Sequence, residues 1–118
     1  MSLAETVSKI DTLTEEQRNC IELCNEAVEI CEWCADACLG DEDMEECARL
    51  CRDVTDLASL HARFMARDSQ FSSQLAEACA DACEACAEEC EQHDADHCQA
   101  CAEILPECAE SCRSIASA

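Results

Sequence analysis

Cysteines occupy the positions along this chain that leucine and isoleucine usually take on the buried face of a helix. The clearest segment is residues 79–90, CADACEACAEEC, whose cysteines stand at positions i, i+4, i+7 and i+11. At about 100° per residue, the four side chains fall within about 60° of one another on one helix face. The intervening residues are alanine, aspartate and glutamate, and alanine and glutamate are strong helix formers. The segment therefore predicts a helix whose buried stripe consists of thiols.

Three further segments repeat this pattern and predict three more helices. The first covers residues 14–39, since Thr14 followed by Gln17 resembles a capping box and Gly40 suits a helix end. The other predicted caps are Asp43 with Glu46 before a helix over residues 44–67, Asp68 or Ser69 before the helix containing residues 79–90, and Asp94 before the last helix. Pro106 lies inside the last helix, where the loss of one backbone hydrogen bond predicts a kink.

Short connections between long helices predict an all-α fold, an antiparallel up-down-up-down four-helix bundle with a cysteine-lined core. Residues 14–118 would form the bundle. Residues 1–13 would form a lead-in, in which a short helix is suggested by Leu3, Val7, Ile10 and Leu13. Because neighbouring helices alternate in direction, inward side chains would collect at two opposite ends. One end would hold Cys38, Met44, Cys47, Cys90, His93, His97 and Cys98, and the other would hold Cys20, His61, Met65, Cys79 and Cys112.

The composition fits one helical domain with unusual chemistry. The chain has 118 residues with one glycine and one proline, which leaves little material for turns or strands. Its 15 cysteines far exceed ordinary usage and indicate metal ligands or disulfides. The first residues are polar, and no apolar segment approaches the ~20 residues that span a bilayer. We therefore expect a cytoplasmic protein, in which thiols stay reduced and metal binding is commoner than cross-linking.

The charge excludes two classes of partner. Acidic residues number 28 against 7 basic ones, which gives a formal net charge of -21. Such a surface repels nucleic acid and anionic membranes, so we expect neither as a partner. High ionic strength would screen the repulsion within the chain, and we therefore expect a salt-adapted source organism. The alternative is an acidic protein whose charge serves only its solubility.

The cysteine spacing suits a soft metal ion. Two cysteines three or four residues apart on a helix can share one ion. Thiolates select Cu(I), which accepts two or three of them in near-linear or trigonal geometry. Facing helices would supply further ligands, so the interior would hold many ions. The predicted Cu(I) ligands are Cys20, Cys24, Cys31, Cys34, Cys38, Cys47, Cys51, Cys79, Cys83, Cys86, Cys90, Cys98, Cys101, Cys108 and Cys112.

Other uses of these cysteines fit less well. Zinc sites usually take four ligands organised by loops, whereas these cysteines all lie on predicted helices. The CxxCxxC run of iron–sulfur ferredoxins is absent, and an odd number of cysteines on regular helices suits disulfides poorly. A thiol oxidoreductase would place a CxxC pair beside predicted strands. Any single reduced cysteine can be ordinary core, although alanine or valine would pack as well without the risk of oxidation.

From residue 20 to residue 112 the chain resembles the cytosolic branch of the four-helix-bundle copper storage proteins. The motifs that carry the resemblance are CIELC at 20–24, CEWCADAC at 31–38, ECARLC at 46–51, CEACAEEC at 83–90 and HCQAC at 97–101. The resemblance covers about four-fifths of the sequence, and the motifs are specific when taken together. The resemblance implies a bundle, often assembled as a tetramer, that stores many Cu(I) ions on thiolates inside its core.

The chain departs from this family at four positions where its members tend to continue the cysteine stripe. These positions are Val54, Ala58, Ala76 and Leu105. They cluster toward the middle of the bundle and the half that contains His61 and Met65. We therefore expect a lower capacity for Cu(I) than in a fully populated relative, with a partly apolar plug that divides the interior.

A few other residues suggest how metal reaches the core. Met44, His93 and His97 would ring one end and offer weaker, exchangeable ligands ahead of the thiolates. His61 and Met65 would serve the opposite end in the same way or simply pack there. A histidine at a helix end is also often only solvated or capping. The remaining large side chain, Trp33, would point away from the thiols, either as a surface residue or, in the favoured interpretation, in a contact between subunits.

The sequence therefore predicts storage and detoxification of Cu(I) by a cytoplasmic homo-oligomer. We expect no catalysed reaction, because no nucleophile–base pair stands out. Two alternatives remain open, namely a copper chaperone or sensor and a zinc or cadmium thiolate sink. A few rapidly exchanging sites would favour the chaperone or sensor, and metal competition would reveal the sink.

Overall fold

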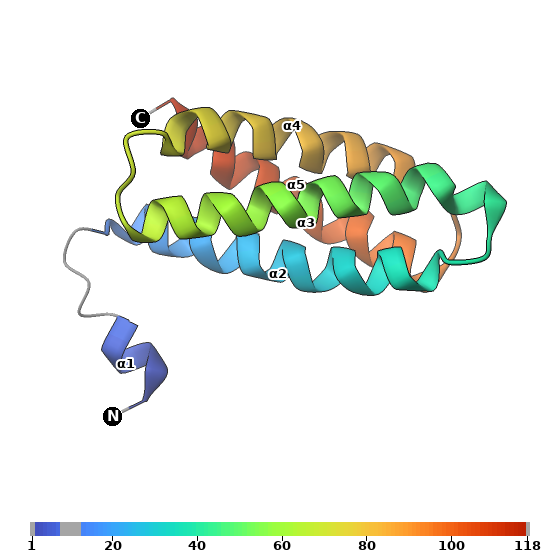
Figure 1. Ribbon diagram of the computed structural model, residues 1–118, viewed down its shortest axis with the longest axis horizontal. Helices are drawn as coiled ribbons and strands as arrows, with labels where there is room; N and C mark the ends of the chain where they lie inside the picture. The colour runs from blue at the N-terminus through green and yellow to red at the C-terminus, as the bar shows by residue number, and fades with distance from the viewer. Residues whose placement is uncertain (1, 8–12, 118) are drawn as a thin grey trace.

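Four long helices form the body of the protein in the computed structural model, which describes residues 2–7 and 13–117. They are α2 (Glu15–Ala37), α3 (Glu45–Ala66), α4 (Ser72–Cys90) and α5 (Asp96–Ala116). Each packs against two neighbours, in the order α2, α3, α4, α5 and back to α2. Successive helices run in opposite directions (Figure 1). The predicted all-α, up-down-up-down four-helix bundle is confirmed.

Two short elements accompany the bundle. Helix α1 (Leu3–Val7) lies to one side of it in Figure 1 and covers two of the four apolar positions of the predicted lead-in helix. Of the other two, Ile10 lies outside the described residues, and Leu13 is buried at the start of the bundle. A single 3-10 turn, η1 (Glu42–Met44), connects α2 to α3.

Helix α2 begins as the sequence predicts. The Gln17 backbone N–H donates to Thr14 Oγ1 at 3.1 Å, and the Thr14 N–H donates to Gln17 Oε1 at 2.9 Å. This reciprocal pair is a capping box, which satisfies two backbone donors that the first turn leaves free. The helix ends at Ala37 with Cys38 as its C-cap, two residues before the predicted end. Gly40 has φ +85° in the following turn, a conformation that glycine adopts without strain.

Helix α3 lacks the predicted cap. It begins at Glu45 after Met44, which makes no side-chain cap hydrogen bond. The prediction of Asp43 with Glu46 was wrong because the preceding residues form η1 instead. There the Asp43 N–H donates to Asp41 Oδ1 at 3.0 Å. Aspartate side chains form such local turns as readily as they cap helices.

Asp68 and Ser69 close α3 and do not cap α4, which begins three residues later at Ser72. The Asp68 N–H donates to the carbonyl of Met65, and the Ser69 N–H donates to the carbonyl of Phe64, both at 3.0 Å. This pair of bonds is the Schellman arrangement, which needs a residue in the left-handed region. Asp68 occupies that region with φ +51°. The predicted cap was wrong because this sequence ends one helix before it starts the next.

Helix α5 begins at Asp96, and its N-cap is Ala95, which has no side chain that can accept a hydrogen bond. The predicted cap at Asp94 was therefore one residue too early. Asp96 instead places a negative charge in the first turn, where it interacts favourably with the helix dipole. The helix continues as one element through Pro106 to Ala116.

The core consists mainly of sulfur and small side chains. The fully buried residues include most of the cysteines together with Ala27, Ala58, Ala76 and Ala80. The largest are Met65, Leu105, His61 and Val54. No helix in the described part of the chain is both long enough and apolar enough to cross a bilayer.

Candidate metal centre

All fifteen cysteines face the interior of the bundle as free thiols, and none is more than 3% exposed. Each of the four long helices contributes at least two of them. Spacings of three and four residues keep the thiols of each helix on one face, and the helices turn those faces toward one another. The inward stripes that the sequence predicts are therefore present.

Five groups of side chains bring three or four metal-ligating atoms within 4.8 Å of one another. The groups fall into two sets that share no residue. We call the first set the His97 cluster, after a histidine that contacts it; it comprises Cys31, Cys34, Cys38, Cys47, Cys51, Cys86, Cys90, Cys98 and Cys101. We call the second set the His61 cluster; it comprises Cys20, Cys24, His61, Cys79, Cys108 and Cys112. Among the described cysteines, Cys83 alone belongs to neither set.

Cys47 contacts three other sulfurs in the His97 cluster. Its Sγ is 3.3 Å from that of Cys90 and 3.8 Å from those of Cys34 and Cys98. These four sulfurs come from four different helices. One soft ion can therefore take thiolates from several helices here and draw them together.

Weaker and more exposed ligands border the same end of the bundle. His97 Nδ1 lies 3.2 Å from Cys34 Sγ and 3.4 Å from Cys98 Sγ, and the His97 ring is partly exposed. The ring packs edge-on against Trp33, with centroids 6.1 Å apart. The Cys38 thiol donates a hydrogen bond to Met44 Sδ, with the two sulfurs 3.8 Å apart. An imidazole and a thioether thus adjoin the thiols where the bundle meets solvent.

The remaining residues predicted to admit metal, His93, His61 and Met65, lie in different surroundings from His97 and Met44. His93 Nε2 lies 2.8 Å from Glu89 Oε2, so its ring faces a carboxylate rather than the thiols. His61 and Met65 are fully buried, so in this structure they line the interior rather than an opening.

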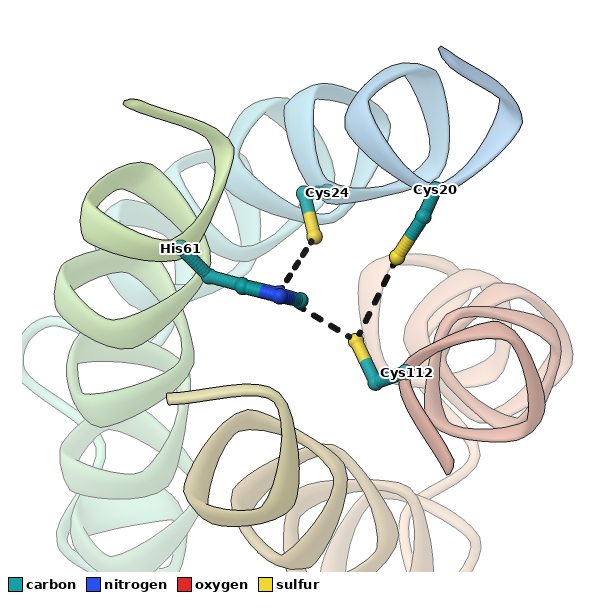
Figure 2. A group of neighbouring side chains, drawn as sticks. All are labelled: Cys20, Cys24, His61 and Cys112. Carbon is teal, nitrogen blue, oxygen red and sulfur yellow. Dashed lines mark hydrogen bonds between the residues drawn. The ribbon is translucent and has the colours of Figure 1, made fainter. Parts of the chain in front are cut away.

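The His61 cluster combines three sulfurs with one imidazole at the opposite end. Figure 2 shows Cys20 and Cys24 on α2, His61 on α3 and Cys112 on α5 converging on one point. His61 Nδ1 is 3.6 Å from the Sγ atoms of Cys24 and Cys112, and Cys20 Sγ is 3.8 Å from that of Cys112. His61 Nε2 is buried without a hydrogen-bond partner in the described part of the chain. A buried imidazole among thiols is a donor set for a metal ion.

Apolar side chains lie between the two clusters. Ala27 on α2, Val54 on α3 and Leu105 on α5 are all fully buried. Each occupies an inward position next to or between cysteines of the stripe. Within the described residues, no metal-ligating group combines members of both clusters.

Burial and neighbouring thiols shift the protonation of the cysteines. Desolvation by burial raises the pKa of Cys38, Cys47 and Cys98 in the His97 cluster. In the His61 cluster, a hydrogen bond with Cys112 lowers the pKa of Cys20, while hydrogen bonds with Cys108 and Cys20 raise the pKa of Cys112. The metal-free core therefore holds protons that a bound cation would displace, because only the thiolate form coordinates metal.

Fold and site together define a class of protein, a helical bundle whose interior is lined with ligands for soft metal ions. The family model for copper storage proteins matches residues 13–117. The uncharacterised cysteine-rich protein YhjQ of Bacillus subtilis strain 168 is 43% identical over an alignment of 101 residues, with coverage of 83% of this chain and 94% of that protein. This chain therefore belongs to the copper storage protein family.

Solved structures of this family share the fold. The Cu(I)-bound copper storage protein BsCsp3 has a TM-score of 0.81 and 41% identity, covering 86% of this chain and 99% of that one. Apo-Csp3 from Bacillus subtilis has a TM-score of 0.78 and 45% identity, covering 82% and 95%. A cytosolic copper storage protein from Streptomyces lividans, studied during copper loading, has a TM-score of 0.83 and 31% identity, covering 88% and 94%.

Two contacts at the His97 end were not predicted from the sequence. The pairing of His93 with Glu89 has a readable signal, because the residues stand four apart on α4 and in the turn that follows it. The contact of Trp33 with His97 has no such signal, since the residues are far apart in sequence and meet only through helix packing.

Proposed function

We propose that this protein stores Cu(I) on cysteine thiolates inside the bundle and so limits free copper. The observation that carries the proposal is the set of fifteen buried thiols that form no disulfide. Fourteen of them fall in groups with ligand atoms within 4.8 Å of one another. Thiolates at these separations suit the two- and three-coordinate geometry of Cu(I). The Cu(I)-bound structure of a relative with the same fold supports it.

All fifteen cysteines are the proposed ligands, and His61 joins them as a buried nitrogen ligand. Its Nδ1 already faces two sulfurs of the His61 cluster. A neutral imidazole coordinates through one nitrogen and needs no counter-charge in a buried site. Met65, also fully buried, is a weaker thioether donor in the same half of the bundle.

Cu(I) enters at the end where His97 and Met44 lie. Both side chains are partly exposed and contact thiols of the His97 cluster, so an ion bound to either has a thiolate within reach. His93, the third residue predicted for this end, faces Glu89, and its part in this path is secondary.

The protein acts without catalysing a reaction. The sequence offers no obvious nucleophile–base pair, whereas the structure places Cys34 Sγ 3.2 Å from His97 Nδ1. A cysteine–histidine pair of this kind is the arrangement of a thiol nucleophile. Cys34 is fully buried, however, which keeps its sulfur away from a substrate larger than an ion.

The proposed setting is the cytoplasm, and the proposed assembly is a homo-oligomer such as a tetramer. The reduced thiols suit a reducing compartment, and a similar protein from Streptomyces lividans is cytosolic. Trp33 is 50% exposed and Leu39 is 67% exposed. Exposed side chains of this size suit a contact between copies of the chain.

Zinc is the second candidate metal, because one group supports it specifically. Three thiols and one imidazole, from Cys20, Cys24, Cys112 and His61, form the Cys3His donor set of structural zinc sites. A zinc or cadmium sink would use this group first. The other groups contain cysteines alone, several of them shared, which favours polynuclear Cu(I) binding.

The deciding experiment is an anaerobic titration of the fully reduced protein with Cu(I) in the presence of a cuprous chelator. We expect at least about one tightly held ion for every two thiols, in line with the two- or three-thiolate coordination of Cu(I). A parallel titration with Zn(II) provides the metal control. One or two ions in total would support a chaperone or sensor, and zinc that resists displacement by Cu(I) would support a zinc sink.

A further inference from the structure

Cys83 lies on α4 between the two clusters. Cys79, one turn before it, belongs to the His61 cluster, and Cys86, three residues after it, belongs to the His97 cluster. Cys83 is fully buried and stands one turn after Cys79 on the same inward face of α4, so its side chain is next to the His61 cluster. Side chains three apart on a helix are neighbours, so Cys86 is within reach on the other side.

The other three helices leave a gap between the clusters. The ligands that border this gap are Cys24 and Cys31 on α2, Cys51 and His61 on α3, and Cys101 and Cys108 on α5. They are separated by seven or ten residues, which is about 10–15 Å along a helix axis. Ala27, Val54 and Leu105 fill the gap with side chains that cannot bind a metal ion. Only α4 continues its thiols without such a break.

We propose that Cys83 is the relay through which Cu(I) passes between the two clusters. This inference rests on the proposed storage of Cu(I) and on entry at the His97 end. An ion held by Cys86 forms a bond to Cys83 Sγ as its bond to Cys86 Sγ breaks, and the Cys83 thiol proton passes to the sulfur that the ion leaves. The same exchange then moves the ion to Cys79 or Cys108. Any other route would carry an unligated cation past apolar side chains, which is far costlier.

The test follows Cu(I) loading over time by anaerobic native mass spectrometry, with a weakly chelated Cu(I) donor. In the unaltered chain we expect an early phase, as the His97 cluster fills, and a later phase, as the His61 cluster fills. Cys83→Ala should leave the early phase in place and slow the later phase about tenfold or more, which corresponds to a barrier at least about 1.4 kcal/mol higher.

A second thiol placed in the gap should restore the transfer. Leu105 stands four residues after Cys101 and three before Cys108, so L105C would complete the thiol ladder on α5. The double variant C83A/L105C should recover the later phase. In the matched control C83A/L105V, valine at position 105 is similar in volume to cysteine but has no sulfur. The later phase of this variant should remain slow.

The outcomes separate this inference from the proposed function. Failure to bind several Cu(I) ions in the unaltered chain would reject storage and the relay together. Storage of several Cu(I) ions by the unaltered chain, together with an unchanged rate of the later phase in C83A, would reject the relay and leave storage intact. Circular dichroism checks that each variant is helical; should C83A fail to fold, the relay then requires L105C alone to load the later ions faster than L105V alone.

Discussion

His93 and His97 stand four residues apart in sequence, yet their rings face different chemistry. His97 Nδ1 contacts the sulfurs of Cys34 and Cys98, whereas His93 Nε2 contacts the carboxylate of Glu89. An ion bound to His97 Nδ1 therefore lies close to two sulfurs and can exchange directly onto a thiolate. An ion at His93 would have to leave a hard oxygen neighbour before it met sulfur.

We therefore predict that His97→Ala slows Cu(I) uptake several-fold and leaves the final number of bound ions nearly unchanged. His93→Ala, the matched control, should change the initial rate less than about twofold, because its ring does not contact the thiols. Stopped-flow mixing with a coloured Cu(I)–chelator complex measures both rates under anaerobic conditions. Equal slowing by the two substitutions would show that the thiol contacts of His97 do not matter for uptake.

The sequence could place these histidines at one end of the bundle but could not distinguish them. Helical spacing fixes the angular position of a residue, which suffices to predict that both rings lie near the thiols. The partner of each ring depends on rotamers and on the neighbouring helix. For the same reason the contacts of His61 with Cys24 and Cys112 follow from packing between helices, although the sequence placed His61 on an inward face.

At the scale of elements, the helices were predictable and most of their starts were not. A repeat of three and four residues is a property of a whole segment, and it tolerates substitution at any single position. A cap depends on one side chain whose hydrogen bond competes with turn hydrogen bonds nearby. Thr14 and Gln17 succeed because each caps the other, while Asp43 and Asp68 serve turns and helix ends instead.

Removal of the capping box should measurably weaken the bundle. We predict that Thr14→Ala lowers the free energy of unfolding of the reduced, metal-free protein by about 1 kcal/mol, because the N–H of Gln17 loses its acceptor. Asp94→Ala is the control, since Asp94 is not the N-cap of α5, and its effect should stay within about 0.5 kcal/mol. Urea unfolding followed by circular dichroism gives both values. A larger loss in the Asp94 variant would contradict the assignment of caps.

At the scale of the whole molecule, two clusters emerge that no single helix reveals. Each helix carries an inward stripe, and the direction of neighbouring helices decides which thiols of different stripes meet. The sequence predicted the two ends of the bundle and the buried apolar plug, because alternation of direction follows from short loops. It could not predict that Cys83 stands outside every group, since that depends on distances between sulfurs on different helices.

The surface of the molecule carries a charge that the fold cannot neutralise. The chain has only 7 lysine and arginine residues to pair with 28 acidic residues. Among the described ion pairs, one arginine is shared by two carboxylates: Arg113 contacts both Asp81 and Glu84, at 2.7 and 2.9 Å. Repulsion among the remaining carboxylates disfavours the compact state more than the unfolded chain, where the charges lie further apart. Added salt screens this repulsion and should therefore stabilise the fold.

We predict that the unfolding temperature of the reduced, metal-free protein rises by about 5 °C or more between 0.02 M and 1 M KCl. Over this range the screening length falls from more than about 10 Å to about 3 Å, shorter than the spacing of most surface charges. Sucrose provides the control, because it stabilises folded proteins by exclusion from their surface without screening charge. Osmotically matched sucrose should produce a smaller rise than the salt. An equal rise would assign the effect to exclusion, and indifference to KCl would remove the argument for a salt-adapted source.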